Sequence, residues 1–161
     1  MVYHGDAYDC GTGMMDTPNL DTLYGQIGVM TTVEHLAAAF YRRVAADPRL
    51  RPLFPDDLQP AIQHLALFLA QRVGGPTTYA QQRGHPRLRL RHRPFRIGRA
   101  ERDAWVGHMV AAMDEVGMPA PARTLLHTYF ADTGTFLINT TDDRRGLLLV
   151  PSGGGTSQNP G

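Results

Sequence analysis

The chain has 161 residues, of which 42% are hydrophobic, and its formal net charge at pH 7 is +1. This length and composition predict one globular domain with its own core. A net charge so close to zero argues against a protein that binds nucleic acid through its overall charge. No stretch approaches the roughly 18 consecutive apolar residues of a membrane-spanning helix, so no membrane anchor is predicted.

The two ends of the chain differ from its middle. Residues 1–20 mix Gly, Asp and Pro without periodicity and predict a flexible leader, and residues 142–161 predict a disordered tail. The leader has no basic region followed by an apolar one, so no signal peptide is expected. The single cysteine, Cys10, cannot form an internal disulfide, which suits a reducing compartment, and we expect a cytoplasmic protein. Residues 21–141 are predicted as the folded domain.

Apolar residues recur with a helical period through most of residues 21–141. They predict four substantial helices, at about residues 31–47, 58–73, 99–116 and 121–137. Thr31 and Glu34 have the spacing of a capping box at the start of the first helix. Gly74-Gly75-Pro76 ends the second. Because no segment predicts a convincing β-hairpin, the expected fold is all-α.

One short stretch carries unusual chemistry. Residues 84–95 contain His85 and His92, and six arginines fall between residues 83 and 96. An imidazole can bind a metal and arginines can hold anions beside it, a combination that suits haem with its iron and two propionates. The alternation of Arg and Leu over residues 87–91 taken alone suggests a strand, although the segment is short and lies between prolines.

Several motifs follow one another in a characteristic order. These are Phe40-Tyr41, Asp47-Pro48-Arg49-Leu50, Leu53-Phe54-Pro55, Gly74-Gly75-Pro76, the run from Arg83 to His92, and the run from Ala100 to Trp105. The pattern resembles the group II truncated haemoglobins, the bacterial two-over-two globins, over about residues 21–141. The resemblance implies a truncated globin fold in which two antiparallel helix pairs sandwich haem b. It also implies that residues 87–92 form a short helix carrying the proximal ligand.

The resemblance assigns a role to each histidine of this stretch. His92 matches the proximal histidine and is the expected iron ligand, neutral, with its Nδ1–H held by a backbone carbonyl. His85 lies seven residues earlier, so both cannot bind one iron from the same side, and a packing or hydrogen-bonding role is expected. The remaining histidines between the ends are expected on the surface or on helix faces: His35, His64, His108 and His127.

Two further residues match the distal side of this family. Tyr41 and Trp105 match its tyrosine and tryptophan, whose O–H and N–H can donate to a bound ligand, and they are the expected catalytic residues. Without the resemblance both would read as core aromatics. Ala61 and Leu65 match distal-helix positions that cannot hydrogen-bond. Phe54 stands where many members have tyrosine, so we expect oxygen release to be faster than in a Phe54→Tyr variant.

Other residues are expected around the cofactor. Arg91 is the candidate for binding a propionate, together with Tyr79 or Arg87. The alternative for any single arginine is a solvated charge on the surface. Apolar contacts are expected from residues that include Phe68, Leu69, Phe95 and Ile97. Met109 and Phe136 could line the same wall or belong to the ordinary core.

The implied function is reversible binding of O2, NO and CO by haem b. Conversion of nitric oxide to nitrate and peroxidase chemistry are open extensions, and both would need a separate reductase. One alternative is a haem-based gas or redox sensor that acts through a protein partner. Nucleic-acid binding through residues 83–96 is the weakest hypothesis, because the basic residues are confined to one segment without a recognised motif. A homodimer is left open.

Overall fold

Six α-helices and one 3₁₀ turn make up the part of the chain that this computed structural model describes, residues 22–141. The predicted leader and tail lie outside these residues. The elements are α1 (Val29–Ala46), η2 (Arg51–Leu53), α2 (Gln59–Arg72), α3 (Thr78–Arg83), α4 (Leu88–His92), α5 (Arg99–Glu115) and α6 (Ala120–Leu137). None of the described residues forms a strand, so the expected all-α fold is confirmed. None of these helices is long and apolar enough to cross a membrane.

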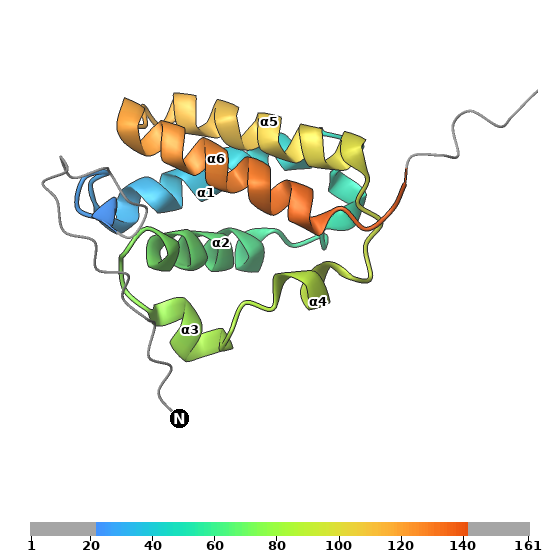
Figure 1. The fold of residues 1–161 in the computed structure, drawn as a ribbon, viewed down its shortest axis with the longest axis horizontal. Helices are drawn as coiled ribbons and strands as arrows, with labels where there is room; N and C mark the ends of the chain where they lie inside the picture. The colour runs from blue at the N-terminus through green and yellow to red at the C-terminus, as the bar shows by residue number, and fades with distance from the viewer. Residues whose placement is uncertain (1–21, 142–161) are drawn as a thin grey trace, which may run out of the picture.

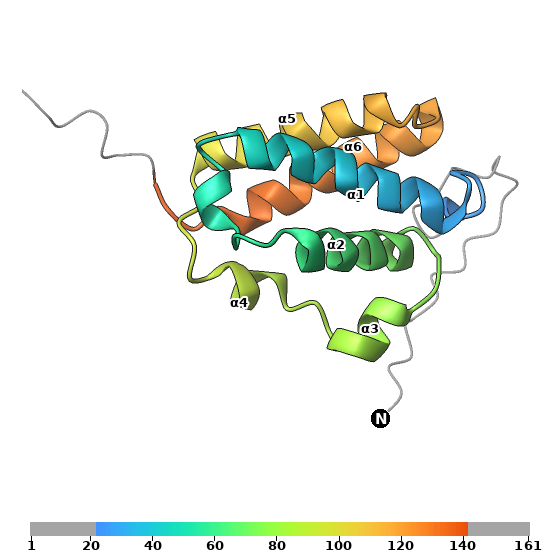
Figure 2. The same ribbon diagram turned by 180° about the vertical axis from the view of Figure 1, so that it is seen from behind.

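The four long helices form two antiparallel pairs. α1 packs against α2, α5 packs against α6, and α1 also contacts α5, which joins the pairs (Figure 1). The short helices α3 and α4 lie beyond α2, on the side away from α5, in both Figure 1 and Figure 2. This is the predicted two-over-two arrangement.

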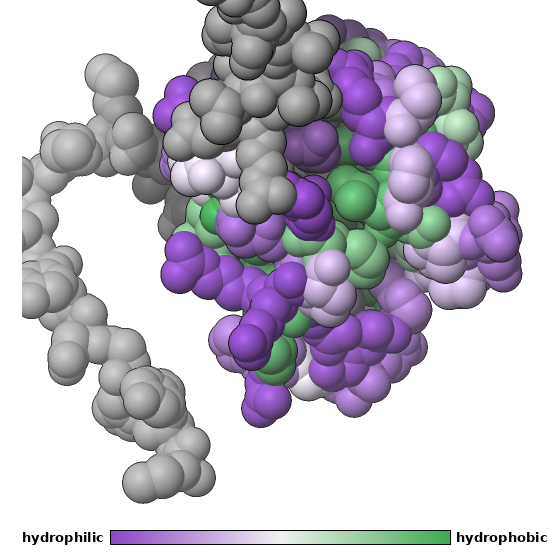
Figure 3. Space-filling view, turned by 90° about the vertical axis from the view of Figure 1, so that its right-hand side faces the viewer, coloured by the Kyte–Doolittle hydropathy of each residue, from purple (hydrophilic) through white to green (hydrophobic). Residues whose placement is uncertain are grey.

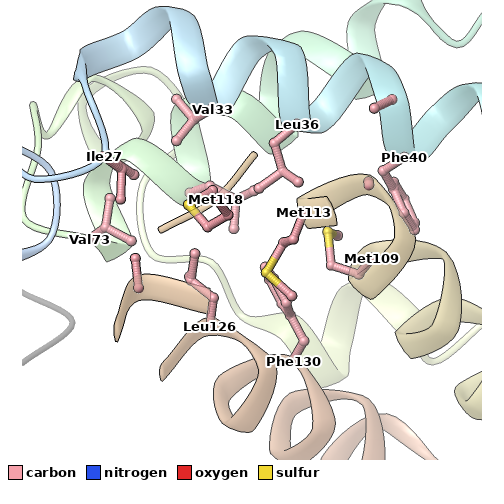
Figure 4. Close-up of a cluster of buried hydrophobic side chains, with 14 of the residues drawn as sticks. Ile27, Val33, Leu36, Phe40, Val73, Met109, Met113, Met118, Leu126 and Phe130 are labelled. Atoms are coloured by element: carbon pink, nitrogen blue, oxygen red, sulfur yellow. The ribbon is translucent and has the colours of Figure 1, made fainter. Parts of the chain in front are cut away.

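Apolar stripes from three helices meet in the core. Figure 4 shows Phe40 of α1, Met113 of α5 and Phe130 of α6 pointing toward a common centre. Each of the three is at most 1% exposed. Because burial of apolar surface is the main favourable term in folding, this cluster fixes the relative positions of the long helices.

Two local expectations drawn from the residue pattern alone turn out to be wrong. α1 begins at Val29, so Thr31 lies inside the helix and does not cap it. The N-cap is Gly28, whose φ of 81° is a left-handed conformation that suits glycine. The strand that the alternation over residues 87–91 suggests when taken alone is also wrong, because Leu88–His92 form α4, the short helix that the resemblance implies. An alternation over five residues is too short to distinguish the two periods.

The Gly74-Gly75 pair ends α2 as predicted, for reasons of space as well as conformation. Gly74 has a φ of 88°. A Cβ atom at Gly75 would lie 2.5 Å from the ring of Tyr24 and 2.7 Å from the carbonyl oxygen of Ala70. The pair therefore allows the chain to turn closely against the end of α2 and continue into α3.

Candidate functional site

A cavity of about 370 Å³ lies among the helices, and its walls are mainly apolar. It is lined by residues from α1, α2 and the loop between them, from α3 and α4, and from α5 and α6. The structure brings together around it most of the residues that the sequence assigned to the cofactor: Tyr41, Phe54, Ala61, Leu65, Phe68, Tyr79, Arg91, His92, Phe95, Ile97 and Trp105.

The aromatic residues of α1 and α5 form one packed group beside the cavity. The ring of Phe40 lies 5.1 Å from that of Tyr41 and 5.6 Å from that of Trp105, in both cases edge to face. Tyr41 also meets Phe54 at 5.6 Å and 90°. Such contacts fix ring orientation as well as burying apolar area.

Both predicted donors keep their polar hydrogens available. Neither the Tyr41 hydroxyl nor the Trp105 indole N–H has a hydrogen-bond partner within residues 22–141, and both side chains line the cavity. Burial raises the pKa of Tyr41 to about 12, so its hydroxyl stays protonated at neutral and moderately alkaline pH. The arrangement can offer hydrogen bonds to a small acceptor inside the cavity.

His92 reaches the cavity from the last position of α4 and is half-buried. Its Nδ1 lies 2.7 Å from the carbonyl oxygen of Leu88, the type of contact expected from the sequence. A carbonyl oxygen can only accept, so this contact places the proton of a neutral ring on Nδ1 and leaves Nε2 as a free lone pair. The geometry suits a metal ligand.

His85 holds the backbone that leads into α4. Arg87, the N-cap of α4, is the one non-glycine residue among those described with a left-handed conformation, at φ 45°. Its N–H donates to Nδ1 of His85 at 3.2 Å. His85 does not line the cavity, and its contact is of the structural kind expected from the sequence. Arg87 does not line the cavity either, which removes support for its proposed contact with a propionate.

Asn139, just after the end of α6, contacts the backbone that follows His92, and sequence reasoning missed it. Its Nδ2 donates to the carbonyl oxygens of Phe95 at 2.8 Å and His92 at 3.3 Å. Its Oδ1 accepts from the N–H of Ile97 at 3.0 Å, and its own N–H donates to the carbonyl of Ile97 at 3.0 Å. A single asparagine after a predicted helix carries no sequence signal for such contacts.

The rim of the cavity is more basic than predicted. His64, expected on the surface or on a helix face, lines the cavity, and its Nε2 lies 3.0 Å from Nη1 of Arg83. Burial, followed by the nearby charges of Arg83 and Arg91, lowers the pKa of His64. The side chain of Arg91 donates to the carbonyl oxygens of Pro86 at 2.8 Å and Arg83 at 3.3 Å. His64 lies one helical turn after Ala61, and that spacing could have identified it.

Phe136 differs from its expected surroundings, whereas Met109 takes one of the two places expected for it. Phe136, placed by its spacing on the inner face of α6, is 50% exposed and does not line the cavity. It lies at the last turn of α6, where its ring packs against the Arg89 guanidinium at 4.5 Å instead. Met109 belongs to the core and is fully buried. His108 is an inter-helix residue, because its Nε2 lies 2.7 Å from Oδ2 of Asp47.

The carboxylate of Asp47 is buried at the end of α1 among polar partners. Arg49 donates to it through its guanidinium and its backbone N–H, and these contacts, with that of His108, hold the pKa of Asp47 well below its usual range. A paired carboxylate stabilises the folded state above its unfolded pKa of about 4, and this contribution is lost on further acidification. Asp47 therefore anchors the loop between α1 and α2.

The described residues form an all-α fold with an apolar cavity, an imidazole nitrogen available to a metal, and two hydrogen-bond donors. The sequence profile of the bacterial-like globins matches residues 22–137. The group 2 truncated haemoglobin of Bacillus subtilis is 40% identical over 110 residues, 68% of this chain and 83% of the relative. The chain belongs to the bacterial-like globin family and, within it, to the group II truncated haemoglobins.

Solved structures agree with this assignment. The haemoglobin of Chloroflexus aurantiacus is 53% identical with a TM-score of 0.72, and the match covers 74% of this chain and 98% of that one. The thermostable haemoglobin of Thermobifida fusca is 48% identical with a TM-score of 0.71, covering 74% and 98%. Truncated haemoglobins are haem proteins, so haem b is the cofactor that the family implies.

Proposed function

We propose that the chain is a haem b protein that reversibly binds dioxygen, with His92 as the axial ligand and Tyr41 and Trp105 as donors to the bound gas. The observation that carries the proposal is the state of His92. Its Nδ1 is held by the Leu88 carbonyl at 2.7 Å, and its ring lies in the wall of the same cavity as both donors. Ligand histidines usually donate their other N–H in this way.

The residues present fit the cofactor. A cavity of about 370 Å³ lies within the roughly 300–1,000 Å³ range of cofactor sites, and its walls are mainly apolar. Arg91, Arg83 and His64 line the cavity as well and would hold the anionic propionates. The Phe68 and Tyr79 rings, 5.4 Å apart, would pack against the apolar macrocycle.

The side chains of α1 and α5 would determine how gas is held. Ferrous haem supplies reversible binding of a diatomic molecule whose outer oxygen is partly negative. The Tyr41 O–H and Trp105 N–H would donate to that oxygen, and the raised pKa of Tyr41 keeps its proton in place. Ala61, Leu65 and Phe54 would exclude water from the donors without competing for them.

We also propose that these donors serve redox turnover, either conversion of nitric oxide to nitrate or peroxidase chemistry. With haem bound, conversion of nitric oxide and dioxygen to nitrate would require the return of one electron in each turnover. We propose a separate reductase as the source of this electron.

The test is the absorption spectrum of purified protein in ferric, ferrous and ferrous-oxy states. His92→Gly should lose the native Soret band and the stable oxy form, because the axial ligand is gone, and added imidazole should restore ferrous ligation. His127→Gly is the matched control, since His127 is an exposed residue of α6 that lies outside the proximal segment and does not line the cavity. Its spectra should equal those of the parent protein.

Two outcomes would contradict the proposal. A His92→Gly variant with parental spectra would exclude His92 as the axial ligand. A folded parent protein that takes up no haem would exclude the gas-binding function itself.

A further inference from the structure

A second hollow lies outside the candidate site, on the surface, where the chain after α4 meets the end of α6. Its volume is about 730 Å³, and we call it the arginine groove. The residues that matter for its chemistry are Arg89, Arg93, Phe95, Arg96, Phe136 and Asn139. Figure 3 looks onto this end of the molecule and shows apolar side chains bordered by hydrophilic ones.

The groove gathers the large apolar side chains that the described residues leave exposed. Leu90 is 57% exposed, Phe136 50% and Phe95 39%, and all three line it. Arg89 holds Phe136 in place, with its guanidinium 4.5 Å from the ring and its Nε donating to the Phe136 carbonyl at 3.4 Å. Exposed aromatic residues gathered beside arginines are typical of protein interfaces.

The arginines of the groove carry uncompensated charge. Arg89, Arg93 and Arg96 have no carboxylate partner among residues 22–141, whereas several other arginines of this part of the chain do, as Arg43 with Glu115 and Arg123 with Asp114. Residues 83–99 contain seven arginines and no Asp or Glu, although the whole chain is close to neutral. Positive charge is thus concentrated on this segment, which favours a negatively charged partner there.

The groove lies directly beside the proposed axial ligand. His92 and Phe95 line both the groove and the internal cavity. Asn139 lines the groove and also holds the carbonyls of His92 and Phe95. A protein seated in the groove would therefore be separated from the cavity by one layer of side chains.

We propose that the arginine groove binds a small acidic flavin-containing electron carrier, with its carboxylates on Arg93 and Arg96 and an apolar side chain against Phe95 and Phe136. This proposal rests on the proposed haem function. One electron passes from the reduced flavin of the carrier to the ferric iron, so the carrier is oxidised and the iron reduced. A second copy of this chain fits the groove less well, because it would bring arginines together. A nucleic acid would leave the apolar contacts unused.

The test is the rate at which a reduced acidic flavodoxin reduces the ferric protein in stopped flow. The variant Arg93→Gln/Arg96→Gln should slow the second-order rate about tenfold at low salt, because steering charges are lost. The matched control Arg42→Gln/Arg123→Gln removes the same formal charge from α1 and α6, outside the groove, and should change the rate less than about twofold. Raising the salt from about 0.02 M to about 0.3 M should remove the difference.

Binding is measured separately, by titrating oxidised flavodoxin into the protein and following the amide resonances of Phe136 and Asn139. Phe136→Ser should weaken binding while reduction by dithionite stays at the parental rate. Absence of a Soret band would defeat the proposed function, whereas this titration would still test the groove.

Three results would overturn the assignment. The first is an equal loss of rate in both double variants, which would show that the rate depends on net charge and not on the groove. The second is self-association that Phe136→Ser abolishes, which would make the groove a homodimer interface. The third is a duplex DNA that displaces flavodoxin from the groove.

Discussion

Tyr41 and Trp105 reach the cavity from two long core helices, whereas His92 reaches it from a helix of five residues. The first two pack through the buried ring of Phe40. The proximal segment, residues 84–97, is mostly exposed and is held by hydrogen bonds from His85, Arg91 and Asn139.

This difference separates the contacts that stabilise the fold from the contacts that position His92. Apolar packing is shared among many neighbours, so the donors are positioned by the same contacts that stabilise the fold. The proximal segment depends on a few polar contacts with backbone groups, each worth about 1 kcal/mol. Changes there should alter the presentation of His92 while leaving the core nearly intact.

The largest effect is expected in the core. Phe40→Ala should lower the free energy of unfolding by about 3–5 kcal/mol, because Phe40 is 1% exposed and truncation leaves a cavity between both donors. Phe136→Ala removes the same atoms from a half-exposed position and should cost less than about 0.5 kcal/mol. Chemical denaturation of both variants measures the contrast, and equal losses would contradict it.

A smaller, local effect is expected in the proximal segment. Asn139→Ala removes three side-chain hydrogen bonds, so the amide of Ile97 should exchange with solvent about 10- to 30-fold faster, as expected for a local loss of about 2 kcal/mol. Asn139→Asp keeps the acceptor for Ile97 and should give an intermediate rate. Exchange in core amides such as Met113 should not change. Unchanged exchange at Ile97 would show that the segment is held by other contacts.

The same division explains what the sequence could predict. Long amphipathic helices show their buried face as a period, so the four long helices and the Gly74-Gly75 stop were predicted correctly. α4 is too short to show a period, and its Arg-Leu alternation taken alone predicted a strand. Only the resemblance to group II truncated haemoglobins predicted the helix there.

Residues that act through tertiary contacts with backbone groups could not be predicted. Asn139 bonds to carbonyl and amide groups more than 40 positions away, and such groups are the same for every residue type. His64 was missed for another reason. Its spacing from Ala61 already placed it on the cavity side of α2, so the signal was present in the sequence but was not used. Phe136 was misplaced because a helical period at the last turn no longer reports burial.

A third prediction tests whether a hydroxyl at position 54, next to Tyr41, can donate a further hydrogen bond to bound dioxygen. Phe54→Tyr adds a hydroxyl beside Tyr41, whose ring lies 5.6 Å away, and one further hydrogen bond to bound dioxygen is worth about 1 kcal/mol. Oxygen release in stopped flow should slow by about five- to tenfold. Phe54→Leu, which offers no donor, should not slow it. Oxygen release from Phe54→Tyr that is as fast as from the parent protein, or faster, would contradict a donor role for a hydroxyl at position 54.

The smallest effect concerns strain in the proximal segment. Arg87 holds a φ of 45°, which costs an L-residue about 1–2 kcal/mol, whereas glycine accepts it freely but loses more entropy on folding. Arg87→Gly should therefore be more stable than Arg87→Ala by about 0.5–1 kcal/mol, a rise of a few degrees in Tm. The alanine variant is the matched control, because it removes the same charge and keeps the Cβ atom. If alanine were the more stable of the two, the left-handed residue would not be strained, and the proximal segment would differ from the packed donors only in being held by hydrogen bonds.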